Sequence, residues 1–245
     1  MPNTFAAVLF DFSATLFDPY RVVTGPGLAE HARKRGVSLD GATAATQCAR
    51  ILARAETAVG LAVQNGTDLS SEHYRKAWSQ VALSVPGVDQ PVADAFYDCL
   101  VDPARWRPYA DTGVMLAALC HAGIRVGVVS NCRWDLRAIF AYHGLADLVD
   151  TYVLSCEQGR EKPDPWMFRY ACEQLGVRPA AALMVGDDPQ TDAGALAAGI
   201  AVYLLPPPVP GERIRGLSAL IGVACGGAGL TSSSAPPLCN FGAIV

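Results

Sequence analysis

The fold of this chain is decided near its N-terminus by the stretch Val8-Leu9-Phe10-Asp11-Phe12-Ser13-Ala14-Thr15-Leu16-Phe17-Asp18. It begins inside a continuous apolar run, residues 6–10 (AAVLF), which is typical of a strand buried on both faces. The run ends at Asp11, whose carboxylate could be a nucleophile, a metal ligand or a cap for the following turn. We therefore expect a buried strand that presents Asp11 at its carboxyl end.

Similar apolar runs recur along the chain and alternate with helix-like stretches. The runs are residues 124–129, 182–185 and 201–205, and the helical stretches are residues 112–122, 133–143, 164–175 and 192–198. This alternation predicts an α/β fold, a Rossmann-like doubly wound parallel sheet with helices on both sides. Ligands of such sheets bind outside the carboxyl ends of the strands, so polar residues at those ends should converge.

The region from residue 20 to residue 105 departs from this pattern, because it shows helical periodicity without a convincing buried strand. Residues 39–63 are rich in helix formers, and Ser70 is placed to cap a helix that runs towards residue 85. We predict a core formed by residues 1–19 and 106–222, and a helical cap formed by residues 20–105. Residues 223–245 are predicted to be a low-complexity tail, rich in Gly, Ser and Pro.

The composition of the chain excludes several function classes. Its 245 residues are 51% hydrophobic, and 19 Lys and Arg against 23 Asp and Glu give a net charge of −4, so we expect no nucleic-acid partner. The eight cysteines form neither a CxxC pair nor a cluster with zinc-ligand spacing. No stretch approaches the roughly 20 apolar residues of a membrane span, and no leader is evident. We expect a cytoplasmic protein without a membrane partner.

Three further strings carry polar residues behind or between the predicted strands. Ser130-Asn131 ends one strand, Lys162 lies in the loop Glu161-Lys162-Pro163-Asp164, and the string from Val185 to Asp192 contains Asp187, Asp188 and Asp192. Each could be an ordinary turn, loop or helix cap. The three carboxylates within six positions nevertheless form an oxygen-ligand set suited to a hard cation such as Mg²⁺.

The order and strand context of these four strings resemble the haloacid dehalogenase superfamily, over about residues 5–205. The resemblance implies a mostly Mg²⁺-dependent phosphohydrolase with a helical cap inserted between the first and second motifs. It makes Asp11 the nucleophile that would form an aspartyl-phosphate, and Lys162 the group that neutralises charge. Ser130 and the Asn131 backbone would bind phosphate oxygens.

The same resemblance implies the metal site. Asp187, a carboxylate oxygen of Asp11 and the main-chain carbonyl of Ser13 would hold Mg²⁺, and Asp188 or Asp192 would complete or orient the shell. The substrate class it implies is a small phosphorylated metabolite, and the protein would be a monomer or a homodimer.

One position departs from the family pattern. Phosphatases of the family carry a second Asp two residues after the nucleophile as general acid and base, and this chain has Ser13 there. A serine hydroxyl is not acidic enough for this role, and general acid–base catalysis is worth about 10²–10⁴-fold. Ala14, which follows, stands where the family usually has Gly. Ser13 is not the bulky aromatic of the dehalogenase branch, and a phosphonatase would need a cap lysine, for which Lys34 and Lys76 are the candidates.

Three interpretations remain open. The chain could be a phosphohydrolase that tolerates Ser13 because its leaving group is already good, as in an acyl phosphate, or because another group such as Asp18 supplies the proton. It could be a scaffold repurposed for a different phosphoryl-transfer or biosynthetic reaction, or a non-catalytic protein that binds a phosphorylated ligand. Specificity should reside in the cap, where the candidate contacts are Tyr20, His31, Arg50, Arg54, His73, Tyr74 and Trp78.

Overall fold

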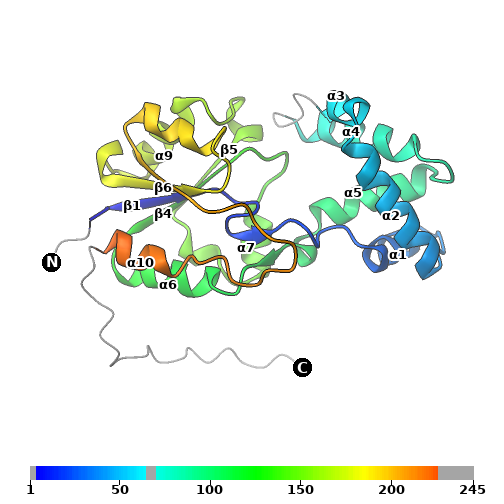
Figure 1. The fold of residues 1–245 in the computed structure, drawn as a ribbon, viewed down its shortest axis with the longest axis horizontal. Helices are drawn as coiled ribbons and strands as arrows, with labels where there is room; N and C mark the ends of the chain where they lie inside the picture. The colour runs from blue at the N-terminus through cyan, green and yellow to red at the C-terminus, as the bar shows by residue number, and fades with distance from the viewer. Residues whose placement is uncertain (1–3, 65–69, 226–245) are drawn as a thin grey trace.

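The centre of the protein is a five-stranded parallel sheet with the strand order β5-β4-β1-β6-β7 (Figure 1). The structure is a computed structural model that describes residues 4–64 and 70–225. The strands are β1 (Ala7–Phe10), β4 (Arg125–Ser130), β5 (Thr151–Leu154), β6 (Ala182–Gly186) and β7 (Ala201–Leu204). Four of them match the predicted apolar runs to within one residue at either end. The predicted α/β fold with a doubly wound parallel sheet is confirmed.

Strand β5 was not among the predicted strands. It lies at one edge of the sheet, where Thr151 and Tyr152 are half-buried and only Val153 and Leu154 are fully enclosed. Thr151 and Tyr152 carry hydroxyl groups, so this four-residue strand has no continuous apolar run. The apolar run that predicted the other strands is therefore missing here.

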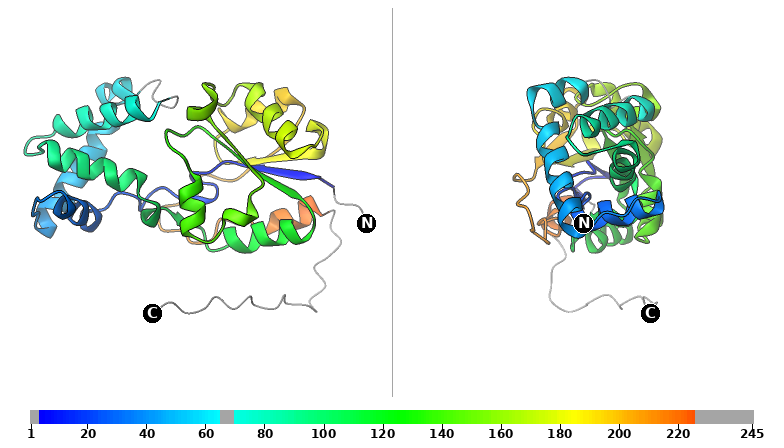
Figure 2. Two further views of the ribbon diagram at one scale, coloured as in Figure 1. Left: turned by 180° about the vertical axis from the view of Figure 1, so that it is seen from behind. Right: turned by 90° about the vertical axis from the view of Figure 1, so that its right-hand side faces the viewer.

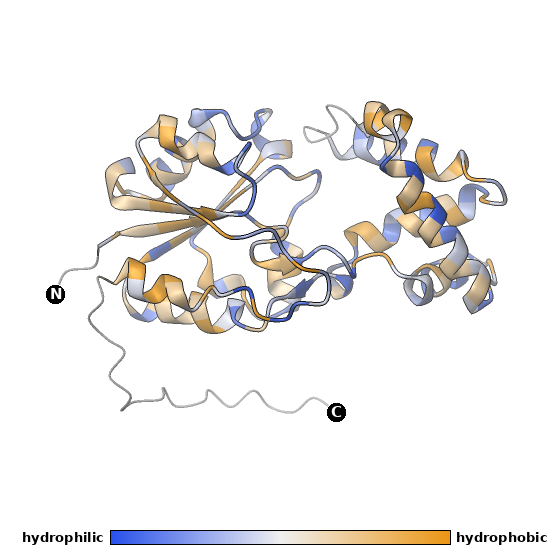
Figure 3. Cartoon of the chain, viewed as in Figure 1, coloured by the Kyte–Doolittle hydropathy of each residue, from blue (hydrophilic) through white to orange (hydrophobic). Residues whose placement is uncertain are grey.

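Alternate residues of β1 pack into two different cores, one on each face of the sheet. Val8 and Phe10 belong to the cluster that contains helix α6, whereas Ala7 and Leu9 belong to the cluster that contains helix α9. The central strands are accordingly coloured hydrophobic in Figure 3, while the helices carry both colours. The helical segments of this part are α6 (Thr112–His121), α7 (Arg137–Tyr142), η3 (Ala146–Leu148), α8 (Ser155–Gln158), α9 (Pro165–Leu175), η4 (Pro179–Ala181), η5 (Asp192–Ala198) and α10 (Ala219–Ala224).

The segment between β1 and β4 contributes a group of helices at one end of the sheet (Figures 1 and 2). These helices are α1 (Gly25–Lys34), α2 (Gly41–Ala55), α3 (Ala58–Gln64), α4 (Ser71–Leu83), α5 (Gln90–Val101) and the short η2 (Pro103–Arg105). Ser70 caps α4 as the sequence predicts, because its hydroxyl accepts the backbone N–H of His73. The helix-rich stretch 39–63 is divided at Thr57, whose hydroxyl accepts the N–H of Gly60 and begins a new helix.

A two-stranded antiparallel ribbon joins the two ends of this helical segment. It consists of β2 (Phe17–Asp18) and β3 (Arg107–Pro108), which lie just outside the boundaries 20 and 105 predicted for the cap. The domain boundaries themselves stay predictions. Helix α10 includes the first two residues of the predicted tail, 223 and 224, and residues 226–245 lie outside the described part. Among the described residues, no helix combines the length and apolar character needed to cross a membrane.

Candidate active site

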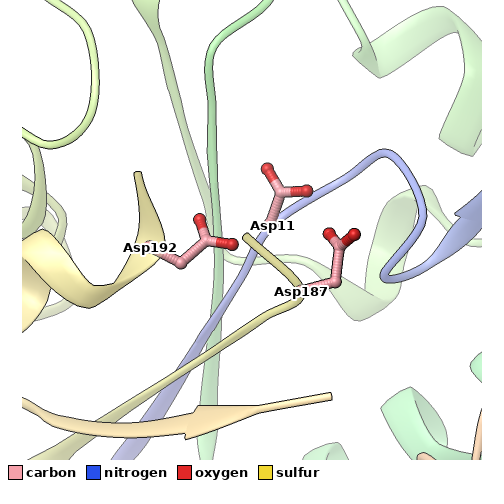
Figure 4. A group of neighbouring side chains, drawn as sticks. All are labelled: Asp11, Asp187 and Asp192. Carbon is pink, nitrogen blue, oxygen red and sulfur yellow. The ribbon is translucent and has the colours of Figure 1, made fainter. Parts of the chain in front are cut away.

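Three carboxylates meet at the carboxyl edge of the sheet. Asp11 directly follows β1, Asp187 follows β6, and Asp192 begins η5. Each offers an oxygen atom, and these three oxygens all lie within 4.8 Å of one another. Figure 4 shows the side chains facing a common space from three separate segments. They can meet because β1 and β6 are neighbouring parallel strands, whose carboxyl ends share one edge.

The close approach of Asp192 depends on a glycine at the end of β6. A Cβ added to Gly186 would lie 2.0 Å from Oδ2 of Asp192, so no larger residue fits there without moving the carboxylate. The same Oδ2 atom accepts the backbone N–H of Asp188 at 3.1 Å. Asp192 is therefore held inside the cluster by its own loop.

Lys162 lies between two of these carboxylates. Its Nζ donates to Oδ1 of Asp11 at 2.5 Å and to Oδ1 of Asp192 at 2.6 Å, and all three side chains are buried. The lysine is positioned by Asn131, whose side chain accepts the backbone N–H of Lys162 at 2.7 Å and donates to its carbonyl at 2.9 Å. The Asn131 side chain thus holds the lysine loop in place, a function that the sequence did not reveal.

Burial and the neighbouring charges shift the pKa values of the cluster. Burial raises the pKa of Asp11 from 3.8 to about 6, although Lys162 opposes the rise and Asp192 adds to it. Burial and the neighbouring Asp192 also raise the pKa of Asp187. Burial works to lower the pKa of Lys162, but Asp11 and Asp192 outweigh it and the pKa is raised. One lysine among three acids leaves an excess of negative charge that a cation would neutralise.

Of the other predicted residues, Ser130 and Ser13 lie near this cluster, whereas the carboxylate of Asp188 binds within its own loop. Ser130 is buried at the end of β4, and Ser13 lies in the loop after Asp11. Asp188 turns its carboxylate to its own loop, where it accepts the N–H of Gln190 and the hydroxyl of Thr191. Of the two residues left open for completing the metal shell, the geometry therefore favours Asp192 over Asp188.

A hollow of about 340 Å³ opens beside the cluster, between the helical segment and the strand ends. Its walls include Ser13, Ser130 and Asn131 on the sheet side and Tyr74 and Trp78 of α4 on the helical side. The hollow therefore joins the predicted phosphate-binding residues to side chains of the predicted cap.

A family model for haloacid dehalogenase-like hydrolases matches residues 5–199, which is most of the chain. The chain belongs to the haloacid dehalogenase-like hydrolases. It is accordingly an enzyme, and the resemblance described from its motifs is confirmed. Asp11, Ser130 and Asp187 lie at or directly after the ends of β1, β4 and β6, and Lys162 lies in the loop between α8 and α9.

Relatives of this hydrolase include named phosphatases. A ribulose-1,5-bisphosphate 5-phosphatase of Halopiger xanaduensis is 31% identical over 212 residues, which cover 82% of this chain and 84% of the relative. A phosphoglycolate phosphatase of Rhodospirillum rubrum is 37% identical over 46% of this chain and 47% of its own. The crystal structure of a phosphatase of the family from Thermococcus onnurineus shares the fold, with a TM-score of 0.61 and 24% identity over 89% of this chain and 96% of that one.

Sequence analysis did not identify a buried arginine, Arg215, that supports the loop after Asp11. The Nε of Arg215 donates to the carbonyl of Ala14 at 2.7 Å, and its Nη2 donates to the carbonyl of Pro206 at 2.5 Å. Ala14 has a φ of 60°, in the left-handed region that glycine favours, at the position where the family usually has Gly. Asp111 fixes the arginine segment by accepting the N–H groups of Arg215 and Leu217. Nothing local in the sequence around residue 215 signals this contact.

Three candidates from the sequence lie elsewhere. Asp18 is buried at the second, smaller hollow and accepts the N–H of Tyr20, so it is not placed to supply a proton to the cluster. Lys34 and Lys76 form exposed pairs with Glu30 and Glu72, and neither lines the 340 Å³ hollow. The geometry therefore offers no cap lysine for the phosphonatase alternative among the residues described.

Proposed function

We propose that this hydrolase is a Mg²⁺-dependent phosphohydrolase that acts on a small phosphorylated metabolite through an aspartyl-phosphate at Asp11. The observation that carries the proposal is the buried arrangement of Lys162 between Asp11 and Asp192, with Asp187 beside them. Relatives named as phosphatases of ribulose bisphosphate and phosphoglycolate support the phosphate-ester class.

The donor set fits the cation. Asp11, Asp187 and Asp192 provide carboxylate oxygens, the ligands that Mg²⁺ prefers, and one lysine does not balance their charge. When bound, the cation would supply charge neutralisation that lets a phosphate dianion approach these carboxylates. Asp11, Asp187 and the main-chain carbonyl of Ser13 would hold it, and Asp192 would complete or orient the shell.

The chain's own residues perform the rest of the proposed reaction. Asp11, ionised above its pKa of about 6, is the carboxylate that would attack phosphorus while the ester oxygen leaves with the electron pair. Lys162 holds that carboxylate and neutralises charge on the transferring group, and Ser130 with the Asn131 backbone binds phosphate oxygens. Water would then release phosphate from Asp11. Ser13 offers no acid to the leaving group, so the proposed substrate is one with a good leaving group.

The test is phosphate release from acetyl phosphate, with Mg²⁺ or with EDTA, by the parent, Asp11→Asn and the control Asp147→Asn. Asp147 is exposed in η3, which leads into the amino end of β5. The carboxylate cluster lies at the carboxyl ends of the strands. Metal-dependent turnover that falls about 10³-fold or more in Asp11→Asn, and is unchanged in the control, is the expected result. Turnover that persists in Asp11→Asn would contradict the role of this residue.

The same experiment addresses the alternative of a non-catalytic phosphate-binding protein. Binding of inorganic phosphate by the parent and by Asp11→Asn alike, without turnover of acetyl phosphate by either, is the result that alternative predicts. A beryllofluoride adduct on Asp11, seen by mass or by ¹⁹F resonance, is what the phosphohydrolase predicts.

A further inference from the structure

The hollow beside the carboxylates is lined on one side by a continuous run of aromatic rings, here called the aromatic wall. Neighbouring rings of the wall have centroids 4.8–6.1 Å apart. The wall draws residues from both the sheet end and the helical segment, and its members, in the order of their contacts, are Phe12, Trp106, Trp134, Tyr74 and Trp78.

This wall begins at the reacting centre. Phe12 directly follows Asp11, and Ser13 and Ser130 line the same hollow. A phosphate held by Ser130 would therefore leave the organic part of the ester facing the rings. Flat apolar groups gain from stacking on such a surface, whereas sugar hydroxyls or a glycolate carboxylate buried there would lose hydrogen bonds to water.

The chemistry at Ser13 points to the same class of ligand. Without a general acid, the leaving oxygen must depart as an anion, and its readiness to do so follows its pKa. A phenol has a pKa of about 10, as in tyrosine, whereas the pKa of an aliphatic alcohol is several units higher. A ring attached directly to the ester oxygen would thus serve both the reaction and the aromatic wall.

We propose that the substrate is an aryl phosphate monoester, whose ring lies against the aromatic wall. This inference rests on the proposed phosphohydrolase function. The Asp11 carboxylate forms a bond to phosphorus as the bond to the phenolic oxygen breaks, and the phenolate leaves with that electron pair. Water then attacks the phosphorus of the acylphosphate, phosphate is released with Asp11 restored, and the phenolate takes up the proton that the water loses.

The experiment measures kcat/KM with Mg²⁺ for three probes: acetyl phosphate, 2-phosphoglycolate and phenyl phosphate. The variants are Trp78→Phe, which keeps an aromatic ring, and Trp78→Ala, which removes it. Trp166→Phe is the matched control, because Trp166 stacks on Tyr170 of α9 and does not line the hollow.

The proposal predicts that phenyl phosphate exceeds 2-phosphoglycolate by about tenfold or more in the parent, a difference of about 1.4 kcal/mol. Trp78→Ala should reduce this ratio by about threefold to tenfold, as expected for an aromatic contact of 0.5–1.5 kcal/mol. Trp78→Phe, which keeps a ring in the wall, and the control Trp166→Phe should each keep a ratio close to that of the parent. Ratios within one variant are independent of how much of it is folded.

Two results would overturn the inference, and they differ in what they say of the proposed function. If acetyl phosphate is hydrolysed but phenyl phosphate is no better than 2-phosphoglycolate, or Trp78→Ala leaves their ratio unchanged, the aryl class is wrong and the phosphohydrolase stands. If the parent turns over none of the three probes with Mg²⁺, both proposals fail.

Discussion

We predict that the metal-free protein loses stability as the pH rises. Much of the loss should come from Asp11, whose carboxylate is buried in the cluster. The perturbation is Asp11→Asn, which removes one ionisable group and keeps nearly the same shape. In the folded protein burial raises the pKa of Asp11 from 3.8 to about 6. The folded state therefore holds this proton more tightly than the unfolded state does, and ionisation between those pH values favours unfolding.

The magnitude follows from the pKa difference. At about 1.4 kcal/mol for each pKa unit, ionising Asp11 in the fold costs about 3 kcal/mol relative to the unfolded chain. This contribution to stability is fully present below pH 3.8 and is lost as the pH rises through about 6. The free energy of unfolding of Asp11→Asn, minus that of the parent, should therefore increase by up to about 3 kcal/mol between pH 4 and pH 7.5.

The assay is urea unfolding followed by circular dichroism in EDTA at several pH values, with Asp147→Asn as the control. Added Mg²⁺ should reduce the difference at pH 7.5, because a cation bound among Asp11, Asp187 and Asp192 favours the ionised carboxylates. A difference between parent and Asp11→Asn that stays constant within about 0.5 kcal/mol across this range, the reproducibility expected for additive effects, would refute the reasoning.

Further predictions concern the acid position, the loop after it and the lysine. Ser13→Asp should raise kcat/KM for 2-phosphoglycolate by about 10²–10⁴-fold but change acetyl phosphate turnover much less, because only the poor leaving group needs the proton; equal gains on both would contradict this. Arg215→Met should lower the free energy of unfolding by about 2–4 kcal/mol in urea titrations, since two buried carbonyls lose a charged donor, and a loss under 1 kcal/mol would argue against it. Ala14→Gly should be neutral or stabilising by up to about 1 kcal/mol, as the left-handed backbone is relieved; marked destabilisation would show that Cβ packing matters more. Lys162→Met should abolish acetyl phosphate turnover and destabilise the metal-free protein by about 3–5 kcal/mol at pH 7.5, and retained activity would remove Lys162 from the mechanism.

Local patterns in the sequence were sufficient for four of the five strands of the sheet and for the order of the motifs. Each central strand is a short apolar run bounded by polar residues, because a parallel strand covered on both faces must be apolar throughout. That property is visible in the chain itself, and so are the carboxylates that follow the runs. The half-buried edge strand β5 and the short ribbon strands β2 and β3 lack such a run, and the sequence did not indicate them.

Contacts between residues far apart in the chain were decided only by the tertiary structure. The choice of Asp192 over Asp188, the support of Ala14 by Arg215 and the aromatic wall each bring together side chains from separate elements. No spacing rule links Phe12 to Trp134, or residue 14 to residue 215. Periodicity reports which face of its own element a residue occupies, whereas the partner it meets depends on how the helical segment and the described residues after β7 pack against the sheet.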